Sequence, residues 1–146
     1  MQLSDVLLHP DEYDGTSVEA PWRWLLPADL SLLQVSVLGH LILSDKAGAI
    51  WLLDTWSGDI YCVGQSYEQY KRQVQTDAEF FESIFFTDLV VLLGAAGLHR
   101  RPGHVFAPFV SPALGGSLTS ENFSLAPIGA YAATSAAEAK VLRGAQ

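Results

Sequence analysis

Three short apolar segments separated by turn residues constrain the fold more strongly than any other feature of this chain. The segments are residues 35–43, 49–55 and 60–63. Gly48 lies in the first intervening turn and Gly58 in the second. Glycine readily adopts the positive φ that tight hairpin turns require. The pattern therefore predicts an antiparallel meander over residues 35–63.

Helix-start signals follow the meander. Residues 66–69, with the sequence SYEQ, match a capping box and predict a helix that runs to about Gln75. Residues 76–79 repeat the signature, and apolar residues at helical spacing continue from there to a stop at Gly97. A third capping box at residues 135–138 predicts a helix at the C-terminal end.

Two later segments have strand character. Residues 104–110 predict a strand that Pro108 confines to an edge or a bulge, and residues 123–131 give a weaker strand signal. In chain order these elements predict an α+β domain. We expect an antiparallel sheet, made of the meander and the later strands, packed against helices on one face.

Length and composition are those of one packed domain covering residues 1–146. Apolar residues make up 49% of the chain and charged residues 16%, which is enough material for one core. The single cysteine, Cys62, excludes an internal disulfide and fits a reducing compartment. No apolar stretch is long enough to span a bilayer, so we expect a cytoplasmic protein without membrane contact. Residues 1–20 are polar and acidic enough to form a loosely ordered N-terminal arm.

Charge is strongly negative and unevenly distributed. Sixteen acidic residues face eight basic ones, for a formal net charge of −8, and residues 1–64 contain nine acids but only two bases. Direct nucleic-acid binding is disfavoured, because that affinity comes largely from lysine and arginine contacts with phosphates. The distribution favours a basic protein partner, although a negative charge can also serve solubility alone.

No catalytic or metal-binding pattern is evident. His99 and His104 are separated by a cationic turn that would repel a metal ion, and Cys62 lies in an apolar segment instead of an electropositive helix start. The chain has no Gly-x-Ser-x-Gly elbow, and Gly115 and Gly116 are not followed by the lysine of a phosphate-binding loop. We therefore expect no enzyme activity, cofactor or metal. A small enzyme is the least supported alternative.

The turn after the second apolar segment contains the best candidate for a binding site. Asp54 and Asp59 flank Trp56 there, and three interpretations are open: paired catalytic carboxylates, solvated turn-capping groups, or an aromatic anchor within an acidic rim. On the third interpretation, a protein partner would be contacted by the following residues: Asp45, Asp54, Trp56, Asp59 and Glu68.

The order of several sequence blocks resembles a known family. The blocks are residues 38–45 (LGHLILSD), 48–55 (GAIWLLDT), 57–59 (SGD), 97–104 (GLHRRPGH), 112–116 (PALGG) and Asn122. Over residues 21–138 this order is similar to that of bacterial type VI secretion immunity proteins. These share a conserved C-terminal domain of unknown function, which is often preceded by a GAD-related domain. Leu38 stands where the family usually has an aromatic residue.

The resemblance implies that the chain binds and neutralises a cognate secreted toxin. In the best-known branch of the family the toxin is a DNase. A nuclease carries a basic DNA-binding face, so the implied partner agrees with the charge of this chain. A protein-binding adaptor module of the same fold, with a partner that is not a toxin, is the alternative.

Overall fold

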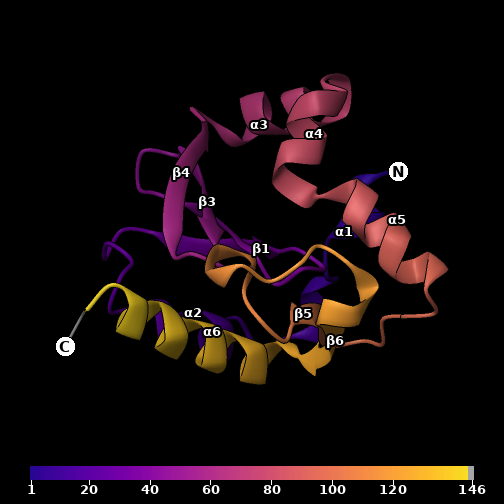
Figure 1. Ribbon diagram of the computed structural model, residues 1–146. Coiled ribbons are helices and arrows are strands. Elements are labelled where there is room, and N and C mark those ends of the chain that lie inside the picture. Colours follow the sequence, from indigo (N-terminus) through magenta and orange to yellow (C-terminus); the bar gives the residue numbers. More distant parts are fainter. Residues whose placement is uncertain (145–146) are drawn as a thin grey trace.

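The structure is a computed structural model that describes residues 1–144. The helices are α1 (Leu3–Val6), α2 (Gly15–Glu19), α3 (Tyr67–Thr76), α4 (Ala78–Phe85), α5 (Thr87–Ala95) and α6 (Ile128–Leu142). The strands are β1 (Ser31–Val35), β2 (Leu41–Ser44), β3 (Ile50–Asp54), β4 (Asp59–Gly64), β5 (His104–Pro108) and β6 (Phe123–Pro127). Figure 1 shows α3 and α4 beyond one end of the meander and α6 across the other side of the molecule.

The predicted α+β class and antiparallel meander are confirmed. Strands β1 to β4 form one antiparallel sheet in sequence order, and β5 pairs with β6 in a second sheet. The first apolar segment, residues 35–43, is not one strand as expected. It contains the end of β1, a turn over residues 36–40, and most of β2. The turn forms because the Ser36 hydroxyl accepts hydrogen bonds from the backbone N–H groups of Leu38 and His40.

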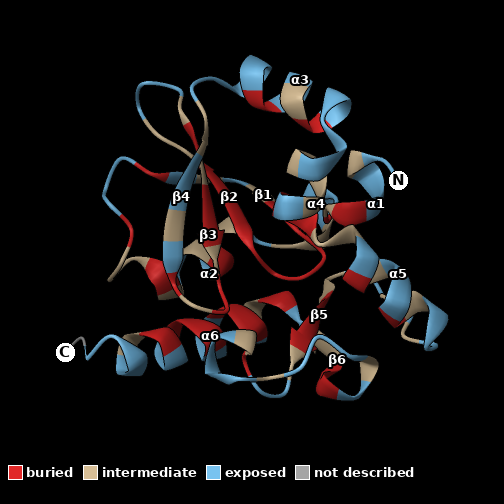
Figure 2. Ribbon diagram, turned by 45° about the horizontal axis from the view of Figure 1, so that its top comes forward, coloured by how far each residue is buried: buried red, intermediate tan, exposed pale blue. Residues whose placement is uncertain are grey.

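Side chains on both faces of the meander are buried, whereas helices on one face were expected. Leu43 and Leu53 belong to a core shared with α6 and the β5–β6 sheet. Ile42 and Leu52, their chain neighbours, belong to a second core shared with α1, α3 and α4. Figure 2 shows β2 and β3 largely buried, whereas β4 is exposed or intermediate along its length. Continuous apolar runs in the two central strands are the sequence signature of this two-sided burial.

The helical region after the meander is divided at Phe86. Helix α3 begins as predicted, with the Ser66 hydroxyl accepting from the N–H of Gln69. The expected continuous helix over residues 76–97 is instead α4 and α5, since Phe86 adopts a left-handed conformation with φ of 51°. The Glu82 carboxylate accepts from the N–H of Thr87 at 2.8 Å and so caps the second helix.

Helix α6 begins seven residues before the predicted capping box. The expected strand over residues 123–131 ends at Pro127, where α6 starts. Ser135, the expected cap, lies inside the helix, and its hydroxyl donates to the carbonyl of Tyr131 at 2.7 Å. The alanine-rich sequence that follows Pro127 has high helix propensity, which overrides the weak strand signal.

The N-terminal segment is packed and not loose as expected. Val6, Leu8 and Val18 are almost completely buried. The N–H of Leu8 donates to the carbonyl of Val35, and the N–H of Val37 donates to the carbonyl of Val6. These contacts hold residues 1–20 against the first strand, so apolar burial outweighs the acidic composition of the segment.

Glu12 links this segment to a part of the chain almost ninety residues away. Its carboxylate accepts from Arg100 Nη1 at 2.5 Å, from the N–H of Gly103 at 3.0 Å and from the N–H of His9 at 2.6 Å. Burial acts to raise the pKa of Glu12, but these charged and backbone donors outweigh it and hold the pKa below its ordinary value.

Substitution Glu12→Gln removes the charge of this link. We expect a loss of about 1–3 kcal/mol in the free energy of unfolding at pH 7, measured by urea denaturation. Because the pKa of folded Glu12 is lowered, its contribution is fully present above 4.5 and is lost as the pH falls through the folded-state value. The matched control is Asp11→Asn in the same turn, with a carboxylate that is 91% exposed. Equal effects of the two substitutions would contradict the role assigned to Glu12.

Candidate partner-binding cleft

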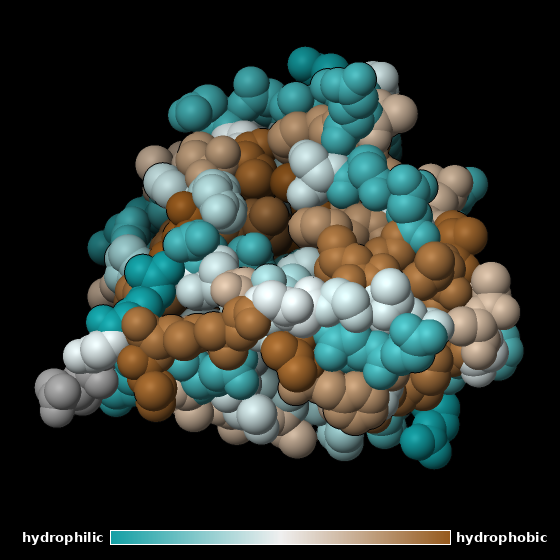
Figure 3. Space-filling view, viewed as in Figure 1, coloured by the Kyte–Doolittle hydropathy of each residue, from teal (hydrophilic) through white to brown (hydrophobic). Residues whose placement is uncertain are grey.

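A cleft of about 350 Å³ lies between β4 and α4. Its walls are mainly apolar, and the side chains with polar groups come from both the sheet side (His40, Asp54 and Tyr61) and α4 (Ser83). The lining residues are His40, Leu52, Asp54, Tyr61, Val63, Phe80, Ser83, Ile84 and Phe86. Figure 3 shows a hollow with a hydrophobic interior, bordered by hydrophilic side chains, in the part of the face where β4 and α4 lie in Figure 1.

Asp54 is placed in the cleft by the end of β3 and the turn that follows. One carboxylate oxygen, Oδ1, accepts from the N–H of Trp56 at 2.9 Å, a contact that closes the turn. The side chain is 25% exposed, and Oδ1 lies 3.6 Å from Nδ1 of His40. The sequence interpretation of Asp54 as a turn-capping group is therefore correct, and the same carboxylate faces the cleft.

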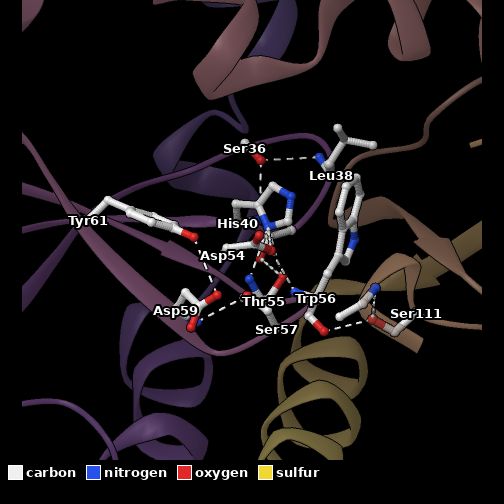
Figure 4. Close-up of polar contacts among 12 residues, drawn as sticks. Ser36, Leu38, His40, Asp54, Thr55, Trp56, Ser57, Asp59, Tyr61 and Ser111 are labelled. Carbon is white, nitrogen blue, oxygen red and sulfur yellow. Dashed lines mark hydrogen bonds and ion pairs between the residues drawn. The ribbon is translucent and has the colours of Figure 1, made fainter. Parts of the chain in front are cut away.

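His40 is buried behind Asp54 in a neutral state. Its Nδ1 accepts from the N–H of Thr55 at 3.1 Å, so the proton of the neutral ring is on Nε2. Burial lowers the pKa of His40, and the nearby Asp54 carboxylate only partly opposes this effect. Nε2 has no hydrogen-bond partner within residues 1–144. Figure 4 shows it on the side of the ring that faces Trp56, where an N–H···π contact is available at a centroid distance of 4.6 Å.

Polar contacts continue from His40 to helix α6. The Thr55 hydroxyl lies 3.1 Å from His40 Nδ1 and 2.8 Å from the Tyr131 hydroxyl, and it donates to the carbonyl of Gly39. Burial raises the pKa of Tyr131, so the phenol is a hydrogen-bond donor at neutral pH. The Tyr131 ring lies directly on Gly39, where an added Cβ would come within 2.4 Å of the ring. Thr55 thus connects His40, at the base of the cleft, to Tyr131 of α6.

Trp56 is not the surface anchor that the sequence suggested. Its side chain is only 6% exposed and packs against His40, Phe86 and Phe123. Its carbonyl accepts from the hydroxyl of Ser111 at 2.6 Å. Trp56 therefore belongs to the packed floor beneath the cleft, because aromatic side chains from distant segments cover it.

The other expected partner-binding residues fall into two groups. Asp59 lies near Asp54, where it accepts from Arg143 at 2.8 Å and from the Tyr61 hydroxyl at 3.3 Å. Asp45 is at the opposite end of β3, in the β2–β3 turn, and accepts from the indole of Trp51, which lowers its pKa. Glu68 is exposed on the first turn of α3. Only the Asp54–Asp59 turn is part of the cleft region.

Several residues of the cleft were not singled out from the sequence. Tyr61 is half-exposed at the mouth, and its pKa is raised by burial and by the negative charges of Asp59 and Asp54. Phe80 and Phe86 come from two aromatic pairs, Phe80–Phe81 and Phe85–Phe86; Phe85 is buried in the core with α3, and Phe80 and Phe81 are partly buried against it. In the sequence, the two adjacent phenylalanine pairs place aromatic side chains on more than one face of a helix. This pattern was the signal that some of them lie outside the main core.

A second hollow, of about 300 Å³, lies between the β3–β4 turn, the β5–β6 sheet and α6. Phe109 borders it and is 70% exposed. The loop that carries Phe109 is held by Asn122, whose side chain pairs with both the N–H and the carbonyl of Val110. Gly116 fits beside it, since a Cβ there would lie 1.8 Å from the Val110 carbonyl oxygen. These contacts explain why Asn122 accompanies the PALGG block.

The described part of the chain has neither a metal-ligand cluster nor a membrane-spanning helix. No group of three or more histidine, cysteine, aspartate or glutamate side chains is arranged to hold a metal ion there. Within the same residues, no helix is both long and apolar enough to cross a bilayer.

Comparison with known proteins shows a similar fold among solved structures and no family. No protein-family model matches the sequence, and no curated protein matches it either. Among solved structures, the chain is similar to Atu4351 from Agrobacterium tumefaciens, with a TM-score of 0.54 and 19% sequence identity. The match covers 89% of this chain and 65% of Atu4351, so the chain spans about two thirds of that protein. At this identity the similarity shows the fold alone.

Substitution Gly39→Ala tests the packing of Tyr131 beneath the cleft. Gly39 has φ of 82°, and an added methyl group would overlap the Tyr131 ring. We expect a loss of more than about 2 kcal/mol in the free energy of unfolding. Gly129→Ala is the matched control, because Gly129 lies in α6 with no neighbour within 4 Å of its Cβ position. It should be neutral or stabilise the protein by up to about 1 kcal/mol.

The neutral state of His40 predicts a specific loss of stability in acid. Because folded His40 resists protonation, its contribution is fully present above the unfolded-state pKa, near 6.5, and declines as the pH falls below that value. Urea unfolding between pH 7.5 and 5.0 should therefore show a smaller decline for His40→Gln than for the natural chain. His9→Gln, at a histidine that is 69% exposed, should keep the natural slope. An unchanged slope in His40→Gln would contradict the assignment.

Proposed function

We propose that this protein is an immunity protein that binds a cognate secreted toxin and neutralises it by covering the toxin's basic functional face. The observation that carries the proposal is the β4–α4 cleft, an apolar hollow with the Asp54 carboxylate inside it, on a chain of net charge −8. Exposed apolar surface beside unneutralised charge is typical of a protein-binding site. On this proposal the protein acts by binding, without catalysis, in the cytoplasm of the cell that makes the toxin.

The partner class follows from charge and from the sequence resemblance. A negatively charged surface accelerates encounter with a positively charged one and can occupy the place of a nucleic-acid backbone. A toxin that cleaves DNA must present such a basic face. The block order over residues 38–122, which resembles that of type VI secretion immunity proteins, favours a toxin of this kind as the partner.

The protein also offers apolar contact area outside the cleft. The β5–β6 loop, which crosses the face shown in Figure 1 below α4, exposes Phe109, Val110 and Leu114. Because Asn122 holds this loop in place, the exposed side chains are ordered before binding, which reduces the entropy lost on association. A protein-binding adaptor with a non-toxic partner would use the same surfaces, and its partner would lack killing activity.

Co-expression with a candidate toxin, taken from the genes that neighbour this one, tests the proposal. We expect cells that express the toxin alone to die and cells that express both proteins to survive. The purified proteins should form a stable complex on size-exclusion chromatography. Death of the cells that express both proteins, or the absence of a complex, would contradict the proposal. A stable complex with a neighbouring protein that does not kill would favour the adaptor instead.

Association kinetics test the electrostatic part of the proposal separately. The double variant Asp54→Asn with Asp59→Asn should associate with the toxin more slowly than the natural chain, and its association rate should depend less on salt. The control, Asp11→Asn with Asp14→Asn, changes the net charge equally at residues that do not line the cleft. The same slowing in both variants would mean that only overall charge matters.

A further inference from the structure

Asp54 is a partly buried carboxylate without a compensating cation in the described structure. Only 25% of its side chain is exposed, and the basic group within 4 Å of it is the buried, neutral His40. By contrast, Glu12 is paired with Arg100, and Asp59, the cross-strand neighbour of Asp54, is paired with Arg143. A carboxylate that loses hydration without gaining a counter-charge is unfavourable. Its position therefore suits a cation supplied from outside.

The shape and lining of the cleft specify the form of that cation. Oδ1 of Asp54 is committed to the N–H of Trp56, whereas Oδ2 has no hydrogen-bond partner within residues 1–144. The same cleft is lined by the aromatic side chains of Tyr61, Phe80 and Phe86. A ligand that joins an apolar stem to a positive charge would complement this lining.

We propose that this cleft receives an arginine side chain of the partner, with the guanidinium group on Oδ2 of Asp54. This inference rests on the proposed function, since it identifies how the basic toxin would be held. Guanidinium suits the site better than ammonium because it is planar, stacks on aromatic rings and is less strongly hydrated.

A short peptide tests the cleft without the toxin. We would titrate the ¹⁵N-labelled protein with acetyl-Gly-Arg-Gly-amide and follow the amide resonances of Tyr61, Val63 and Ser83. Saturable shifts at these positions, with an affinity on the order of millimolar, are expected. The lysine peptide should bind more weakly, and the glutamine peptide should cause no saturable shifts. Equal shifts with the arginine and glutamine peptides, or arginine shifts located elsewhere, would overturn the proposal.

Two variants separate charge from shape. Asp54→Asn keeps an oxygen that can accept from the N–H of Trp56 but removes the negative charge, and it should weaken arginine-peptide binding at least about tenfold. Ser83→Phe obstructs the mouth without changing the charge and should abolish saturable binding. Asp14→Asn, which keeps the cap of α2 on the opposite side of the sheet, should bind as the natural chain does. Retained binding in both cleft variants would overturn the proposal.

Different results would contradict the arginine site and the proposed function. If the toxin is bound and neutralised equally by the natural chain and by Asp54→Asn, and the arginine peptide does not bind, the function stands and the arginine site is wrong. If the peptide binds the cleft and Asp54→Asn abolishes this binding while no toxin complex forms, the arginine site stands and the toxin assignment is wrong.

Discussion

The hydrogen bond from the N–H of Thr55 to Nδ1 of His40 is the interaction on which the cleft depends. It joins the end of β3 to the turn before β2 in the buried interior, where His40 is 1% exposed. The bond requires an unprotonated Nδ1, so it sets both the tautomer and the charge of the ring. With a neutral histidine behind it, Asp54 keeps its negative charge uncompensated and directed toward the cleft. A protonated His40 would instead neutralise Asp54 internally.

Local sequence signals were sufficient for part of the fold. The glycine turns of the meander and the Ser66 cap of α3 depend on neighbouring residues, and the structure confirms both elements. The division at Phe86 was missed because it depends on the Glu82 side chain, which caps the next helix from five residues before Thr87. The N-terminal segment was misjudged because the residues that bury and neutralise it, Arg100 above all, are distant in sequence.

The candidate site was found only in part for the same reason. Asp54 and Asp59 were selected correctly as neighbours because they flank a single turn. The burial of Trp56 could not be foreseen, since Phe86 and Phe123 cover it from two separate segments. His40 gave only a weak signal, a histidine inside an apolar run, and its role depends on Thr55, which is fifteen residues away. The cleft itself could not be predicted from local sequence, because its walls come from β4 and α4, which are separate segments of the chain.

A structure of the protein in complex with the toxin that we propose as its partner would test the central claim most directly. The account predicts that an arginine of the toxin enters the β4–α4 cleft, with its guanidinium group within hydrogen-bond distance of Asp54. A complex in which the cleft stays open to solvent, with the toxin bound elsewhere, would contradict it.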